Sequence, residues 1–217
     1  IKLKKFNFSK KQLALLKIIF DKKTNIIFIS GPAGTGKTFI SIYGALQCYN
    51  MNNDYNITYV RTIIESGDRS LGALPGEMQE KINPYMMPMY DKLDEVLHTG
   101  HSVKVKEKNI ITGLPINFLR GASWIDEIVV ADESQNFTFK ELTTLITRIG
   151  KNTKLLICGD PMQSDINGKT GFNDMRAIFN NPESMKRGIH CFNFDRDDIK
   201  RSEILKFIID KLQHYKK

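Results

Sequence analysis

Gly31-Pro32-Ala33-Gly34-Thr35-Gly36-Lys37-Thr38 is the stretch that decides the fold of this chain. It matches the pattern G-x-x-x-x-G-K-[ST], in which a glycine-rich loop wraps the phosphates of a nucleotide with its backbone N–H groups. We expect all eight residues to lie against the nucleotide, with the Lys37 ammonium at the β- and γ-phosphates and the Thr38 hydroxyl as a ligand of Mg²⁺. A simple glycine turn would explain the glycines, but it would not explain lysine followed by threonine.

The residues around this loop have the patterns of a strand and a helix. Asn25 to Ser30, just before it, is a short β-branched apolar run, and the apolar spacing from Gly36 to about Met51 suits a helix. Further runs typical of strands lie at Ile57 to Val60, Glu127 to Ala131, Lys154 to Cys158 and Ile189 to Phe194. Because strands alternate with helices, the sequence predicts an α/β fold with a parallel sheet covered by helices on both faces.

Helical signals lie before, between and after these strands. They are a capping box at Ser9 and Gln12 for a helix ending near Asp21, a helix from Glu77 to His98 interrupted at Pro84 and Pro88, a second capping pair at Thr138 and Glu141 for a helix to Ile149, and an amphipathic pattern from Ser202 to His214. The sequence therefore predicts helices between most of the strands.

The middle of the chain has weaker patterns. Thr62 to Gly76 contains three glycines and a proline, which predicts a long loop. Val103 to Lys106 and Asn109 to Thr112 are interpreted as the two strands of a small basic hairpin, and Ile116 to Leu119 as a further strand. A loop as long as the first of these segments is usually functional.

Polar side chains follow two of the predicted strands. The run Ile128-Val129-Val130-Ala131 leads into Asp132 and Glu133. We expect Asp132 to hold Mg²⁺ through water and Glu133 to polarise the water that attacks the γ-phosphate. Gln163 follows the strand Lys154 to Cys158, and its amide is expected to sense the γ-phosphate, because the carboxyl ends of parallel strands face the nucleotide. A plain polar turn is the alternative interpretation of both strand ends.

Length, composition and charge exclude several classes of protein. The 217 residues, 41% of them hydrophobic, fit one globular domain spanning residues 1–217. No apolar run approaches the roughly 18 residues that a membrane-spanning helix needs, so we expect no membrane partner. The three cysteines lack a C-x-x-C pair and indicate no disulfide framework. The formal net charge of +8 favours a polyanionic partner such as nucleic acid, although surface lysines also serve solubility.

Several stretches, taken together, make the chain similar to the PhoH-like ATPase family. Beside the loop GPAGTGKT they are Arg61 to Gly76 (RTIIESGDRSLGALPG), Gln79-Glu80-Lys81, Pro84-Tyr85, Asp132 to Asn136 (DESQN), Thr147 to Gly150 (TRIG) and Gly159 to Asp165 (GDPMQSD). The resemblance runs from about Ser9 to the C-terminus. Many unrelated proteins share the loop, whereas the elements L-G-x-L-P-G, D-E-x-Q-N and T-R-I-G in this order are specific. Thr62 and Ser134 depart from the proline and alanine usual in the family.

The resemblance carries implications for fold, activity and partners. It implies a RecA-like P-loop NTPase fold similar to the first core of superfamily 1 helicases, with ATP and Mg²⁺ as cofactors and ATP hydrolysis as the activity. It also implies engagement of RNA or single-stranded DNA and a homo-oligomeric, hexameric ring. A single RecA-like core fills the chain, so a ring would let a neighbouring subunit complete the ATP site. We expect such a protein to be cytoplasmic.

Further residues are expected to have individual roles. The resemblance implies that Gln12 hydrogen-bonds the adenine, with the capping-box role as the alternative. Arg201 is expected to act as an arginine finger on the γ-phosphate, with Arg148 as its rival. For nucleic acid we expect contacts from Arg61, Arg69 and Lys81, with Arg120 a weaker candidate; ion pairing with acidic residues is the alternative.

Three classes of function remain open at this point. The first is an ATP-hydrolysing motor or helicase on nucleic acid. The second is a nucleotide-dependent switch or binding module with slow turnover and no unwinding, which would need neither Glu133 nor Gln163. The third is a small-molecule kinase, against which the D-E-x-Q-N element argues. The first class accounts for most of these motifs.

Overall fold

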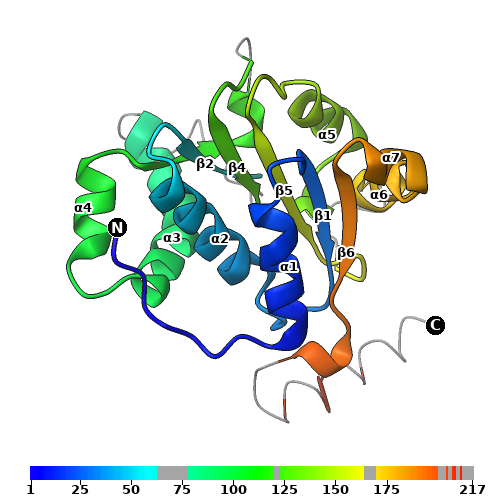
Figure 1. The fold of residues 1–217 in the computed structure, drawn as a ribbon, viewed down its shortest axis with the longest axis horizontal. Helices are drawn as coiled ribbons and strands as arrows, with labels where there is room; N and C mark the ends of the chain where they lie inside the picture. The colour runs from blue at the N-terminus through cyan, green and yellow to red at the C-terminus, as the bar shows by residue number, and fades with distance from the viewer. Residues whose placement is uncertain are drawn as a thin grey trace.

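A parallel β-sheet of six strands forms the centre of the molecule (Figure 1). The computed structural model describes residues 1–62, 78–119, 123–163 and 170–199, together with residues 204, 207, 208 and 211. The strands are β1 Ile26–Ser30, β2 Asn56–Arg61, β3 Ile111–Pro115, β4 Glu127–Ala131, β5 Lys154–Gly159 and β6 Ile189–Asn193. Their order across the sheet is β3-β2-β4-β5-β1-β6, and every neighbouring pair is parallel. Because every residue of β1, β4 and β5 is buried, the sheet needs cover on both faces.

Helices provide this cover through two hydrophobic clusters. The helices are α1 Lys10–Phe20, α2 Lys37–Met51, α3 Met78–Val96, α4 His101–Glu107, α5 Phe139–Ile146, α6 Phe172–Phe179 and α7 Pro182–Lys186. On one face, apolar residues of α1, α2, α3 and α4 pack on strand residues such as Ile27, Tyr59 and Val130. On the other face, α5 and α6 pack on Phe28, Val129 and their neighbours. The predicted fold class, an α/β fold with a parallel sheet and helices on both faces, is confirmed.

Local sequence signals explain where several helices begin. Ser9 and Gln12 form the predicted capping box of α1, and Thr138 and Glu141 form that of α5. The helix α5 ends at Ile146, three residues before the predicted end. No helix was predicted at α6 or α7.

The prediction of a hairpin near residue 105 is wrong. Val103 to Lys106 lies in the helix α4, and residues 111–115 form the edge strand β3, parallel to β2. Four residues in which valine and lysine alternate are too few to distinguish the period of a strand from that of a helix. In the helix that forms, Val105 is buried and Val103 is exposed. The strand predicted at Ile116 to Leu119 is also wrong, because Ile116–Phe118 is a 3-10 turn, η2.

The predicted interruptions at Pro84 and Pro88 are wrong as well. The helix α3 runs continuously from Met78 to Val96 with both prolines inside it. Each proline lacks the N–H of one helical hydrogen bond. The burial of Met86, Met89 and Leu93 in the core offsets this loss and holds the helix on the sheet.

Some predictions fall on residues outside the described part of the chain. These are the loop after Thr62, Arg69, Arg120, Arg201 and most of the helix from Ser202 to His214; within that last segment residues 204, 207, 208 and 211 are helical. Of Lys81 the structure describes the backbone position in α3. Among the described helices, none is long and apolar enough to cross a membrane.

Candidate nucleotide-binding site

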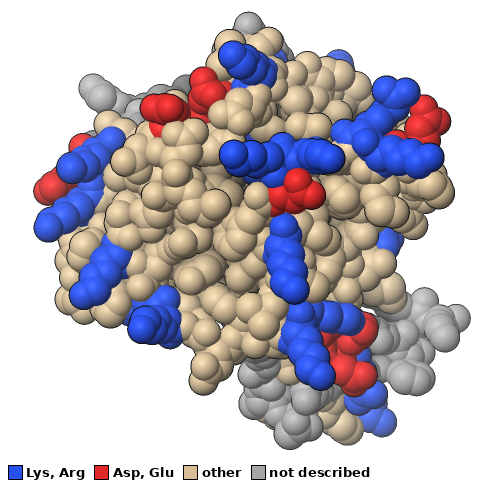
Figure 2. Space-filling view, viewed as in Figure 1, with Lys and Arg blue, Asp and Glu red and all other residues tan. Residues whose placement is uncertain are grey.

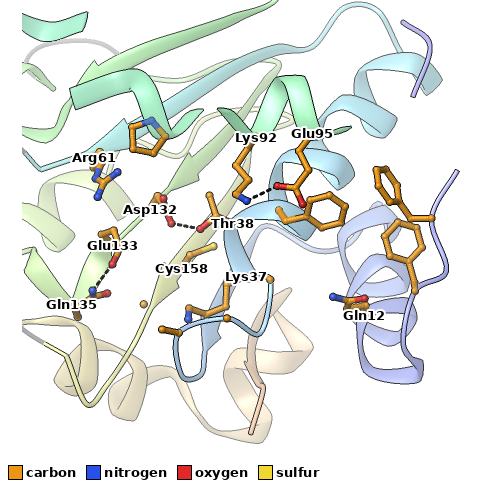
Figure 3. A pocket seen from close by; sticks show the side chains of 18 of the residues that line it. Gln12, Lys37, Thr38, Arg61, Lys92, Glu95, Asp132, Glu133, Gln135 and Cys158 are labelled. Carbon is orange, nitrogen blue, oxygen red and sulfur yellow. Dashed lines mark hydrogen bonds and ion pairs between the residues drawn. The ribbon is translucent and has the colours of Figure 1, made fainter. Parts of the chain in front are cut away.

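A cavity of about 720 Å³ opens at the carboxyl edge of the sheet, where the residues after β1, β4 and β5 meet (Figure 3). The glycine-rich loop and the start of α2 form its floor, and Asp132, Glu133 and Gln135 come from the segment after β4. Residues of α3 and of the N-terminal segment form the opposite wall. The strand order, which puts β5 between β1 and β4, thus brings the two motifs found in the sequence to one cavity.

The backbone of the glycine-rich loop has a shape in which residues other than glycine would be strained. Gly34 and Gly36 have φ angles of 84° and 83°, in the left-handed region that favours glycine. Gly36 precedes the first turn of α2, and no side chain caps that turn. The first N–H groups of this 15-residue helix therefore point outward as donors, which is the arrangement that binds phosphate.

Lys37 is held across the loop from which it projects. Its Nζ atom donates to the carbonyl oxygens of Gly31 at 2.7 Å and Pro32 at 3.0 Å. The Thr35 hydroxyl also donates to Pro32, at 2.9 Å, and the Ala33 N–H donates to Asp160 Oδ2 at 3.1 Å. These bonds fix the loop and keep the lysine ammonium at its centre, where β- and γ-phosphate oxygens would lie.

Thr38 and Asp132 meet at the floor of the cavity. The Thr38 hydroxyl donates to Asp132 Oδ1 at 2.6 Å, and the Asp132 N–H continues the ladder by donating to Val60 O at 2.8 Å. Hydroxyl and carboxylate oxygens are the ligand types that Mg²⁺ prefers, so the predicted metal-holding pair fits that ion.

A buried tyrosine holds the other oxygen of this carboxylate. The Tyr59 hydroxyl, from β2, donates to Asp132 Oδ2 at 2.6 Å. Burial, and next the negative charge of Asp132, raise the pKa of Tyr59 well above its ordinary value, so the phenol keeps its proton as a donor. Tyr59 was not predicted as a site residue, because it occupies an ordinary core position in a predicted strand.

Glu133 is directed into the cavity by its backbone. It has a φ angle of 52° and begins the 3-10 turn η3, Ser134–Asn136. Gln135, two residues later, donates from Nε2 to Glu133 Oε2 and accepts from the Asp160 N–H at 3.0 Å. Asp160 in turn binds the loop at Ala33. The predicted water-polarising carboxylate is therefore connected to the phosphate loop through two side chains.

Gln135 lies at the cavity, where Gln163 was predicted to lie. Gln135 is 3% exposed and lines the cavity, whereas Gln163 is exposed and lies outside the residues that line it. The backbone N–H of Gln163 donates to Asp160 O at 3.1 Å. Gln135 could have been identified from the sequence, because its amide stands only two residues after Glu133.

Gln12 forms the predicted capping box, and its side chain also lines the cavity. Its Oε1 accepts from the Ser9 N–H at 3.2 Å, which is half of the capping box, so that alternative is confirmed. The side chain also lines the cavity, with its Nε2 on the side of Gly36. Phe6, Phe8 and Phe39 lie beside it as an aromatic group that the sequence analysis missed; the ring centroids of Phe6 and Phe39 are 4.9 Å apart.

Basic side chains also reach the cavity. Arg61, at the end of β2, lines it together with Asp132 and Glu133, and Lys92 pairs with Glu95 on α3 (Figure 3). Arg61, which was predicted to contact nucleic acid, lines this cavity. Among the described residues, Arg148 does not line this cavity.

Cys158 lies at the bottom of the cavity, at the end of β5. Its thiol is 3.2 Å from the Ser41 hydroxyl, and burial raises its pKa to about 12. The group is therefore a neutral thiol that packs beneath the loop and brings no charge to it.

Comparison with known proteins agrees with the motifs. The profile of a family described as PhoH-like protein matches residues 6–213. A PhoH-like protein of Bacillus subtilis (strain 168) is 33% identical over 189 residues, which cover 87% of this chain and 58% of the relative. Protein PhoH of Escherichia coli (strain K12) is 31% identical over 197 residues, covering 89% and 54%. The chain thus spans a little over half the length of these relatives.

A solved structure was also found. The crystal structure of Pif1 helicase from Candida albicans is similar with a TM-score of 0.42 and 13% identity, over 89% of this chain and 42% of that one.

Proposed function

We propose that this chain, which belongs to the PhoH-like protein family, binds ATP with Mg²⁺, hydrolyses it, and uses the hydrolysis to act on RNA or single-stranded DNA. The observation that carries the proposal is the meeting of Lys37, Thr38, Asp132 and Glu133 in one cavity. A phosphate loop alone would support nucleotide binding. The carboxylate of Glu133, which lines the same cavity, adds the group that hydrolysis requires.

Each group has a part in this chemistry. The N–H groups at the start of α2 and the Lys37 ammonium bind the phosphates and stabilise the negative charge that grows as the γ-phosphate leaves. Mg²⁺, held by Thr38 and through water by Asp132, would neutralise charge on the β- and γ-phosphate oxygens. Glu133 accepts a hydrogen bond from the attacking water, and Gln135 keeps that carboxylate in place. Arg61 adds a further cation at the γ-phosphate side.

The base end of the cavity supports the choice of ATP. The Gln12 amide has both a donor and an acceptor, as adenine does at N6 and N7, and Phe6, Phe8 and Phe39 supply apolar surface for a base. We therefore keep Gln12 as the proposed adenine contact. The same side chain holds the first turn of α1 through the capping box.

Nucleic acid is proposed to bind through Arg69, in the sequence between β2 and α3, and through Lys81 in α3. On the described part of the face drawn in Figure 2, basic side chains lie singly and in small groups, with acidic ones beside some of them. A continuous basic groove is not visible on that face. The face drawn therefore does not by itself support nucleic-acid binding. Arg61 is proposed for the nucleotide as well as for nucleic acid, because it lines the cavity.

We expect single-stranded RNA or DNA to raise the rate of ATP hydrolysis, which phosphate release measured with and without oligonucleotide would show. Binding should weaken with salt, and Arg69→Ala combined with Lys81→Ala should reduce the slope of log affinity against log salt by about 1.4, at about 0.7 per phosphate contact. Lys186→Ala, at the end of α7, is the matched control. A flat, slow rate would favour the switch, and transfer of phosphate to a metabolite would favour the kinase.

The ring and the arginine finger remain part of this proposal. The segment before Arg201 is anchored near the site, because Lys11 on α1 pairs with Asp195 and with Asp198, the latter at 2.7 Å, and Ile199 is buried. A finger just after this anchor could serve its own site or a neighbour's.

Mixed assemblies test the finger. Lys37→Ala subunits and Arg201→Ala subunits are each expected to be inactive, since fingers contribute roughly 10³- to 10⁵-fold in rate. In a ring with the finger in trans, mixing them restores some sites that have both an intact loop and an intact arginine. Activity is measured in assemblies whose mixed composition has been verified by mass. No recovery there would place Arg201 in cis or outside the reaction.

A further inference from the structure

We infer that Tyr59 is a positioning residue that fixes the carboxylate of Asp132 and thereby sets how tightly the site holds its divalent ion. The inference rests on the proposed function, because it assigns Asp132 to the ion that accompanies ATP. The observation behind it is the hydrogen bond of 2.6 Å from the Tyr59 hydroxyl to Asp132 Oδ2. Tyr59 does not line the cavity and would touch neither nucleotide nor ion.

The register of the sheet explains why a tyrosine reaches this carboxylate. Tyr59 on β2 pairs with Val130 on β4, and Asp132 follows two residues later. Side chains two residues apart point to the same face, and the strand advances about 6.6 Å over that distance. A tyrosine side chain, lying along the strand, places its hydroxyl at the carboxylate. A phenylalanine or leucine would pack in the same place without supplying a donor.

Packing holds the tyrosine in this orientation. Its side chain is fully buried in the cluster formed with residues such as Ile57, Val130 and Met86. Rotation of the ring away from Asp132 would require the core to open. The hydroxyl is therefore a fixed donor, set by the same packing that holds α2 and α3 on the sheet.

The two oxygens of Asp132 have separate partners. Thr38, on α2, donates to Oδ1, and Tyr59, on β2, donates to Oδ2. The Thr38 oxygen keeps lone pairs for the ion while its proton remains on Oδ1. With Tyr59 on the other oxygen, the plane of the carboxylate is set from both sides. Loss of such an outer partner typically costs 10- to 100-fold in metal affinity or activity.

Tyr59→Phe removes the hydroxyl and keeps the ring. We expect the Kd of Mn²⁺, used as a paramagnetic probe in place of Mg²⁺, to rise about 10-fold or more in the complex with ADP. Electron paramagnetic resonance measures free Mn²⁺ with protein in excess, so that all ADP is bound. The Kd of ADP without a divalent ion should stay unchanged. The kcat of ATP hydrolysis should fall at low Mg²⁺ and recover as Mg²⁺ is raised, with little change in the KM for ATP.

Tyr55→Phe is the matched control. Tyr55 stands just before β2, and its hydroxyl donates to Asn152 Oδ1 at 2.8 Å, far from the cavity end of the strand. This variant loses the same atom and one hydrogen bond, and it should bind Mn²⁺ like the wild type. If Tyr59→Phe does not fold, as judged by circular dichroism, Tyr59→Met fills the site with a flexible side chain and again lacks the donor.

The outcomes separate the two proposals. Weaker Mn²⁺ binding in Tyr59→Phe or Tyr59→Met, with the control unchanged, supports the positioning role. Wild-type Mn²⁺ affinity in a folded Tyr59 variant would overturn it and leave the proposed function intact. If the wild-type protein held no Mn²⁺ in the presence of ADP, the proposed function itself would fail.

Discussion

Lys37→Ala is expected to lower the rate of ATP hydrolysis by roughly 10²- to 10³-fold, the loss seen when one preorganised donor to developing charge is removed. Lys37 Nζ lies at the centre of the phosphate loop, held by Gly31 O and Pro32 O. Those carbonyl bonds keep the ammonium in place before the nucleotide arrives. Alanine removes the charge, and the helix start at α2 keeps its N–H donors.

Phosphate release under single-turnover conditions is the measurement, with nucleotide affinity determined in parallel. Lys17→Ala, an exposed lysine in the last turn of α1, is the control for loss of one positive charge. Hydrolysis by Lys37→Ala at a rate near that of the wild type would remove the lysine from the reaction, and with it the proposed role of the loop in hydrolysis.

Glu133→Gln is expected to bind ATP with near wild-type affinity and to hydrolyse it about 10²- to 10⁴-fold more slowly, the range that a positioned general base contributes. The amide keeps the shape of the side chain and can still contact Gln135, but it is a poor acceptor for the proton of the attacking water. The phosphate loop and Asp132 are untouched.

An ATP-bound complex that persists through gel filtration, followed by slow phosphate release, would show this separation. Glu183→Gln, on the exposed helix α7, is the control, since its carboxylate pairs with Arg187 at the surface. If Glu133→Gln turned over ATP at the wild-type rate, the assignment of both carboxylates after β4 would have to be withdrawn.

The sequence was informative wherever chemistry and local structure coincide in one short stretch. Gly31 to Thr38 combines a strand end, a strained turn and a helix start, so its motif predicts position and role together. Asp132 and Glu133 follow an apolar run that is typical of a buried strand and forms one, β4. Because the carboxyl ends of parallel strands lie on one edge, the meeting of these two motifs followed from the fold class.

Tyr59 and Arg61 show what could not be predicted in the same way. The role of Tyr59 depends on the pairing of β2 with β4, a long-range register that no local pattern contains. Arg61 lies at the end of β2 and lines the cavity, and this position depends on how β2 pairs with β4 and not on a local pattern. The hairpin prediction at Val103 to Lys106 failed for a different reason. These four residues lie in the seven-residue helix α4, which is too short to distinguish a helical period from a strand period when one valine is buried and the other exposed.

The contact between the phosphate loop and the chain after β6 has a consequence for how far this protein can be shortened. The Phe194 N–H donates to Ser30 O at 2.7 Å, and a Cβ on Gly31 would lie 2.7 Å from Phe194 Cβ. Gly31, the first residue of the loop, thus packs closely against Phe194, which lies more than 160 positions later in the chain. A fragment that ended at β5 would retain both sequence motifs and lose the surface that shapes Gly31. We therefore expect a fragment to need the chain at least through Phe194 if it is to keep the shape of this loop.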